Sequence, residues 1–238
     1  MIEFNKILVE LRYLKKTTFK NLYVGPFFRL HKIYNINAEF GGFFNSEAPL
    51  GYNGYTAMGL GPIVNYDSRD VLVNPTKGKF IDFNFIYNPG GIYNSNGFIT
   101  FKSDLRTYKK LSTTKHRVLG VQFVSQLGFG NIPFKDLAEF GGPLIMRGYY
   151  QGYFRYPFMY AAQIEYRHTI WRFLGFATWL GAGATTNKWY QFKEESLHPN
   201  AGAGLRFRIN KKDNLNIRLD YGIGKHQQGF YIDIAESF

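Results

Sequence analysis

The sequence of 238 residues has no cysteine, no long hydrophobic run and no long run of like charges. The absence of cysteine excludes disulfide scaffolds, thiolate metal sites and cysteine nucleophiles. No stretch approaches the roughly 18 consecutive apolar residues of a membrane-spanning helix, so helical membrane proteins are excluded. The net charge of +12 comes from basic residues that are scattered or paired, whereas nucleic-acid-binding proteins usually concentrate them. We therefore expect no nucleic acid among the partners.

Recognisable enzyme motifs are also missing. The sequence has no Gly-x-Ser-x-Gly nucleophile elbow, no phosphate-binding loop and no paired histidines at metal-ligand spacing. A hydrolase built on a sheet would need a serine and a histidine at matched height on neighbouring strands, and no such pair is evident. We therefore expect no enzymatic activity, no metal and no cofactor. The five histidines are scattered, at positions 31, 116, 168, 198 and 226.

Aromatic residues are abundant, at 19% of the chain, although the mean hydropathy is negative at -0.26. This combination is typical of strands in which apolar and polar side chains alternate. Between residues 215 and 221, for example, leucine, isoleucine and tyrosine alternate with asparagine, arginine and aspartate. The same pattern predicts eleven strands, at about residues 6–14, 21–33, 56–67, 79–88, 97–108, 116–128, 158–170, 174–184, 201–210, 214–224 and 229–238.

Alternation alone would also fit a water-soluble β-sandwich, but three features favour a membrane barrel. Many of the strands are longer than the usual five or six residues and match the roughly nine to eleven that cross a bilayer. The polar faces carry charges of both signs, as expected inside a barrel. Short connections such as 210–214 alternate with long ones such as 129–157. The sequence therefore predicts an all-β fold in which residues 1–238 form a single antiparallel transmembrane β-barrel domain.

Four segments carry motifs in a fixed order. They are YDSRD at 66–70 followed by NPTKG at 74–78, GGPLIMRGY at 141–149, EYR at 165–167, and GAGLRF at 202–207 followed by LDYG at 219–222. In order and spacing these segments resemble the BamA/TamA superfamily, also called the bacterial surface antigen family. The resemblance covers residues 59–238, while strands 6–33 fit by pattern only.

The resemblance implies that the long loop folds back into the barrel and is held there by a loop lock of Arg147, Gly148, Tyr149 and Glu165. Arginine suits this role because its planar fork bonds a carboxylate at two points, and glycine allows close backbone approach. The family also has an aspartate on the following strand, where this sequence has Gly181. We therefore expect a weaker lock and a more isolated Glu165 than in the family. The alternative is an ordinary surface loop with a solvated arginine.

The charged segment after residue 66 is similar to a periplasmic turn of the family. Its motif residues are Asp67, Arg69, Asp70, Pro75 and Gly78. The two aspartates could also be interpreted as metal ligands or as a catalytic pair. A charged turn that ends in proline and glycine is far more often structural, so we expect a structural turn.

The end of the sequence resembles the C-terminal signal that the barrel-assembly machinery reads. Phe230, Ile232, Ile234 and Phe238 share one face at two-residue steps, and on strict alternation Glu236 would face lipid as well. The alternative is the edge strand of an ordinary sheet.

The number of strands raises a question of completeness. The family's barrels have sixteen strands, preceded by periplasmic polypeptide-binding repeats, and neither the first five strands nor the repeats are visible here. A fragment of a longer protein, a shortened barrel with one more strand, and a barrel completed by a partner chain are all open, and we favour the fragment. We expect the eleven strands to belong to a barrel of 12 to 16 strands.

The resemblance implies an integral protein of the bacterial outer membrane, in contact with lipid and lipopolysaccharide, that inserts or translocates client outer-membrane proteins. The alternative is a passive pore, or a membrane anchor for a partner domain. A polypeptide-binding region encoded upstream would favour the first function.

Overall fold

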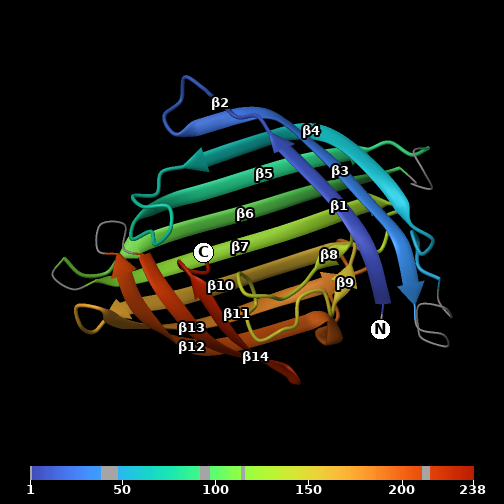
Figure 1. Cartoon of the computed structure of the whole chain (residues 1–238). Helices are drawn as coiled ribbons and strands as arrows, with labels where there is room; N and C mark the ends of the chain where they lie inside the picture. Colours follow the sequence, from blue (N-terminus) through green and yellow to red (C-terminus); the bar gives the residue numbers. More distant parts are fainter. Residues whose placement is uncertain (1, 39–47, 92–96, 114–115, 211–214) are drawn as a thin grey trace.

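The computed structural model describes residues 2–38, 48–91, 97–113, 116–210 and 215–238, and its regular structure is almost entirely β (Figure 1). None of these residues belongs to a helix long and apolar enough to span a membrane. The elements are β1 (Ile2–Arg12), β2 (Lys15–Lys16), β3 (Leu22–Ala38), β4 (Tyr55–Asp67), β5 (Gly78–Asn88), β6 (Phe98–Lys110), β7 (Arg117–Gly130), β8 (Ala138–Glu139), β9 (Arg155–Tyr156), β10 (Phe158–Thr169), β11 (Leu174–Thr186), the 3-10 turn η1 (Glu194–Ser196), β12 (Leu197–Asn210), β13 (Leu215–Gly224) and β14 (Gln227–Ile234).

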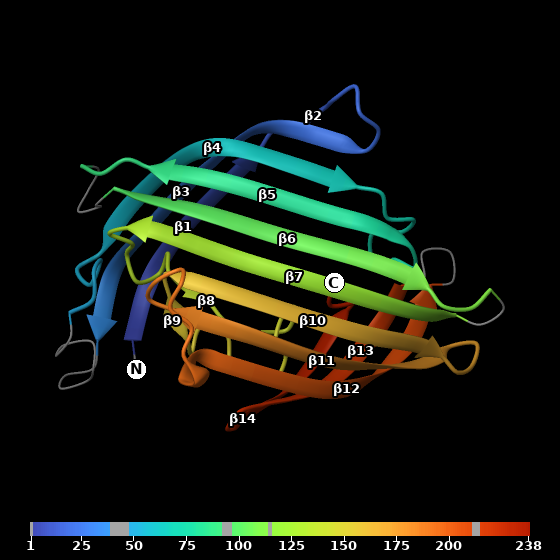
Figure 2. The same ribbon diagram turned by 180° about the vertical axis from the view of Figure 1, so that it is seen from behind.

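The long strands form one antiparallel sheet in the order β1-β3-β4-β5-β6-β7-β10-β11-β12-β13-β14, and the short β2 pairs with β3. The sheet curls strongly, as Figures 1 and 2 show from opposite sides. β1 and β14 are its two edge strands, and no pairing joins them in the described part of the chain. β8 and β9 form a separate two-stranded sheet on the concave side. The predicted all-β antiparallel architecture with eleven long strands is confirmed.

The two faces of the sheet differ sharply in chemistry. On β10, Gln163, Glu165 and Arg167 point into the concave interior and are buried, whereas the intervening Ile164 is 42% exposed. This is the reverse of a water-soluble β-sandwich, in which the apolar face is covered. The predicted alternation is therefore confirmed, with the polar residues inside. Other exposed apolar residues on the outer face include Leu60, Tyr87, Leu180, Leu205, Phe230 and Ile232.

The connections separate the two ends of the strands. The β4–β5, β6–β7 and β10–β11 connections lie at one end, here called the turn end (Figure 1). The opposite end, here called the loop end, carries the connection of residues 131–157 between β7 and β10. Strand β3 continues to Ala38, several residues beyond its predicted end, and β1 begins earlier than predicted. The loop end is therefore built by strands that extend further than their alternation indicated.

Candidate functional site: a long loop anchored inside the curved sheet

The connection of residues 131–157, here called the long loop, is folded into the concave side of the sheet. Phe140, Met146 and Tyr149 are fully buried and pack with Met159 and Ala161 of β10. Met146 and Gly148 both have positive φ, at 54° and 111°, so the chain turns sharply on either side of Arg147. This conformation directs the arginine at the sheet.

Arg147 lies at the tip of the long loop, with no exposed surface. It donates hydrogen bonds to Glu165 on β10 and, over 2.5 Å, to Oδ2 of Asp220 on β13. Its guanidinium carbon is 3.5 Å from the ring centroid of Trp179, close enough for a cation–π interaction. The alternative of a solvated surface arginine is therefore wrong. The expectation of a more isolated Glu165 is also wrong, because Asp220 binds the same arginine.

The two carboxylates belong to a larger network. Asp220 also accepts hydrogen bonds from Arg206 over 2.5 Å and from Arg218 over 3.0 Å, while Glu165 accepts one from Arg167 over 2.6 Å. Several arginines thus share each buried carboxylate, which offsets the cost of removing these charges from water. We call this network the interior charge cluster; it comprises Arg147, Glu165, Arg167, Arg206, Arg218, Asp220 and Glu236.

A row of glycines makes room for the loop tip. Trp179 on β11 is in register with Gly202 on β12. Gly202 is in turn in register with Gly222 on β13, and Gly222 with Gly229 on β14. A Cβ atom on Gly202 would lie 2.1 Å from the Trp179 ring, and one on Gly222 would lie 2.6 Å from the carbonyl carbon and oxygen of Arg147. The backbone of the tip therefore rests directly on the backbone of β13. Motif comparison did not predict this contact, although the glycines at 202 and 222 lie within the resembling segments.

Gly148 and Tyr149 complete the tip. The Gly148 amide donates a hydrogen bond to the hydroxyl of Tyr231, 3.0 Å away. The buried Tyr149 hydroxyl donates to the carbonyl of Pro199 over 2.7 Å and accepts from the Lys225 amide over 2.8 Å. The structure thus brings all four residues of the sequence-based loop lock into one buried site, whose effect on assembly stays a prediction.

A second anchor holds the beginning of the long loop, and motif comparison missed it. Asp136 is buried against β3, where Arg29 and His31 both bond its carboxylate; Nδ1 of His31 lies 3.0 Å from Oδ1. Arg29 also contacts Glu10 of β1 at 3.3 Å. Burial alone would raise the pKa of Asp136, but the His31 hydrogen bond and the Arg29 charge outweigh it and hold the pKa at about 2.

The charged turn motif forms a compact structure at the turn end. Arg69 donates to both carboxylate oxygens of Asp67, over 2.9 and 2.7 Å. Asp70 accepts from the amide and the hydroxyl of Thr76, over 2.9 and 2.5 Å; burial opposes these bonds, but they lower its pKa. No group of three or more potential ligands among the described residues could hold a metal ion. The other two motif residues are the buried Pro75 and Gly78, whose φ is +106°.

The last strand departs from its predicted course. Phe230, Ile232 and Ile234 lie exposed on the outer face of β14, as the alternation indicates. The strand then ends at Ile234, and Ala235 adopts a φ of +76° that reverses the side-chain alternation. Phe238 is consequently buried, stacking with Tyr108 at a centroid distance of 6.3 Å. The expectation that Phe238 shares the exposed face is therefore wrong.

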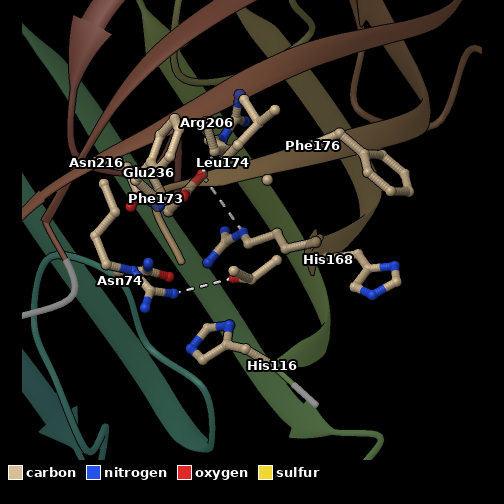
Figure 3. A pocket seen from close by; sticks show the side chains of 13 residues that line it. Asn74, His116, His168, Phe173, Leu174, Phe176, Arg206, Asn216 and Glu236 are labelled. Atoms are coloured by element: carbon tan, nitrogen blue, oxygen red, sulfur yellow. Dashed lines mark hydrogen bonds and ion pairs between the residues drawn. The ribbon is translucent and has the colours of Figure 1, made fainter. Parts of the chain in front are cut away.

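Interior arginines explain this turn. Glu236, expected to face lipid, instead accepts hydrogen bonds from Arg206 over 2.7 Å and from Asn216 over 2.8 Å. Arg167 donates to the carbonyl oxygen of Phe238 over 2.6 Å. Figure 3 shows Arg206, Asn216 and Glu236 on one side of a small cavity of about 10 Å³, with His116 across from them. This space is about the size of one water molecule.

Comparison with known proteins agrees with this geometry. Residues 15–238 match the family described as the Omp85 superfamily domain. The crystal structure of BamA from Haemophilus ducreyi lacking POTRA domains 1–3 is similar in fold, with a TM-score of 0.62 at 17% identity over 91% of this chain and 50% of that one. The chain thus spans about half the length of that protein. No curated protein matches the sequence. Because the family match covers most of the sequence, the resemblance inferred from the motifs is confirmed, and the chain belongs to the Omp85 superfamily.

Proposed function

We propose that the chain forms the integral β-barrel part of a bacterial outer-membrane protein that inserts or translocates other proteins. The observation that carries this proposal is the long loop, which is anchored through Arg147 to Glu165 and Asp220 inside a sheet with an apolar outer face. The outer face suits lipid and lipopolysaccharide, and the interior charges require a polar environment.

The edge strands support a role with client strands. β1 and β14 end the sheet, so each presents backbone groups that no described strand pairs, and such groups are costly in hydrocarbon. A client strand, further strands of the same protein or a partner chain would satisfy those groups by pairing. In this proposal the turn end faces the periplasm, and Phe230, Ile232 and Ile234 contribute to recognition by the barrel-assembly machinery, with the buried Phe238 contributing only before the tail folds inward.

The competing function is a passive pore or a membrane anchor. The long loop and the interior charge cluster occupy the concave side near β10 to β13, which argues against an open water-filled channel there. A pore would conduct ions in a planar bilayer without affecting other outer-membrane proteins.

The test is to deplete the protein in its native host and to complement it with the wild type or with Arg147→Ala. We expect depletion to lower the amounts of folded outer-membrane proteins, measured by heat-modifiable migration on gels, and the variant to restore them poorly. Arg155→Ala is the matched control, because Arg155 lies in the same loop and forms only a half-exposed pair with Glu139. Unchanged client levels together with steady ion conductance would support the passive pore instead.

A further inference from the structure

A second cavity, of about 260 Å³, lies between β1, β3, β6, β7 and the beginning of the long loop. It is distinct from the site of Arg147, and it is large enough for a small ligand rather than a single water molecule. Lys6 of β1, Lys102 of β6 and Lys135 of the long loop line it. Lys6 is exposed, so the cavity is reached from the side of the edge strand β1.

The carboxylates on the cavity wall already have partners. Glu10 and Asp136 share Arg29, and Asp136 also bonds His31. The third carboxylate, that of Glu139, pairs at 2.6 Å with Arg155, which does not line the cavity. Arg29 and Arg155 together balance two of these three carboxylate charges, so one negative charge remains on the wall.

The lysines, by contrast, have no such partners. Within the described residues, no carboxylate oxygen lies within 4.0 Å of the ammonium group of Lys6, Lys102 or Lys135. Lys102 and Lys135 are half-buried, and the Lys135 ammonium lies 4.1 Å from the ring centroid of Phe4. Burial, followed by the nearby charge of Arg155, lowers the pKa of Lys135, although the charge of Glu139 acts in the opposite direction. Ammonium groups in such surroundings favour an anionic ligand.

We propose that this cavity binds a phosphate group. Three ammonium groups around one cavity suit the three terminal oxygens of a phosphate better than the two oxygens of a carboxylate, and lysine is a common phosphate ligand. Arg29 and Gln126 lie in the same wall, where Gln126 already donates to the Asp136 carbonyl at 3.2 Å. The phosphate belongs either to a free small molecule or to a lipid headgroup. The site does not depend on the proposed role in protein insertion.

Chemical labelling of lysines tests the site directly. The full chain in a maltoside detergent is treated with acetic anhydride alone, with inorganic phosphate, or after transfer to phosphatidylglycerol nanodiscs, and labelling is read by mass spectrometry. We expect labelling of Lys102 and Lys135 to fall by about fivefold in at least one arm, while Lys188, exposed at the loop end, labels as before. Protection by phosphate identifies a free ligand, and protection only in the nanodiscs identifies a headgroup.

Two outcomes would overturn the proposal. One is labelling that stays the same in both arms, or that falls equally at Lys188. The other is protection of Lys102 by a polyglutamate peptide but not by phosphate or lipid, which would assign the cavity to an acidic polypeptide.

Variants give an independent measurement. Lys102→Gln should weaken binding of the protecting ligand by about tenfold, and Lys188→Gln should leave it unchanged. Heat-modifiable migration shows whether each variant folds. If Lys102→Gln fails to fold, Lys6→Gln on the exposed edge strand carries the same expectation, and unchanged affinity in the folded variant contradicts the proposal.

Discussion

The two anchors of the long loop have opposite polarity. At the tip, the loop supplies the cation, Arg147, and the sheet supplies two carboxylates. At the beginning of the loop, the loop supplies the carboxylate, Asp136, and the sheet supplies a guanidinium and an imidazole. Arg147 is fully buried and bonds two carboxylates, whereas Asp136 shares Arg29 with Glu10. We therefore expect the tip anchor to be the stronger one.

The comparison is tested most strongly at the tip. Arg147→Ala leaves two buried carboxylates with fewer partners, so we expect a loss of about 3 to 5 kcal/mol in the free energy of unfolding. Urea titration followed by heat-modifiable migration measures this loss. Arg155→Ala is the control and should cost no more than about 1 kcal/mol, since its partner Glu139 is half-exposed. Equal losses in the two variants would mean that burial at the tip contributes nothing.

The backbone contact beneath the tip can be probed without changing any charge. A methyl group at Gly222→Ala would collide with the carbonyl of Arg147, so we expect a loss of about 1 to 3 kcal/mol and faster proteolysis of the long loop. Gly91→Ala is the control for adding a methyl group in the open, because nothing lies near that position, although its positive φ adds some strain. A stable Gly222→Ala with an intact loop would show that the tip has room to move.

The Asp136 anchor should respond less to substitution. Asp136→Asn removes the charge but keeps a polar side chain, and Arg29 retains Glu10. We therefore expect a loss of about 1 to 2 kcal/mol by the same urea titration. A loss as large as that of Arg147→Ala would reverse the ranking of the two anchors.

Acid should weaken the Asp136 anchor by a smaller amount. The pKa of Asp136, about 2, lies below its value in the unfolded chain, so the charged carboxylate stabilises the fold above about pH 4, and this contribution is lost as the pH falls toward 2. We expect the difference in unfolding free energy between wild type and Asp136→Asn to shrink by about 1 kcal/mol from pH 6 to pH 3. A difference that stays constant would contradict the lowered pKa.

The local features of this molecule follow from its sequence, whereas the contacts between residues far apart in the chain do not. Alternation placed Glu165 and Arg167 inside because side-chain direction has a period of two along a strand. It could not find Asp220, which lies 73 residues from Arg147, or His31, which lies 105 residues from Asp136. Those pairings depend on how many strands separate the partners and on the curvature of the sheet.

The tail illustrates a different failure. The predicted strand extends the two-residue steps of Phe230, Ile232 and Ile234 to Phe238, although this places Glu236 on the apolar face. The interior arginines bond Glu236 and Phe238 instead, and these tertiary interactions override the pattern. A charged Glu236 on the apolar face is the sequence signal against the longer strand, but it does not identify Arg206 as the partner.

The double anchoring of the long loop has a geometric consequence. Asp136 is tied to β3, near one edge of the sheet, and Arg147 is tied to β10 and β13, near the other. The segment between them thus bridges the concave side of the sheet from β3 to β10 and β13. The ten loop residues between Asp136 and Arg147 therefore help to set how strongly the sheet curves between these strands.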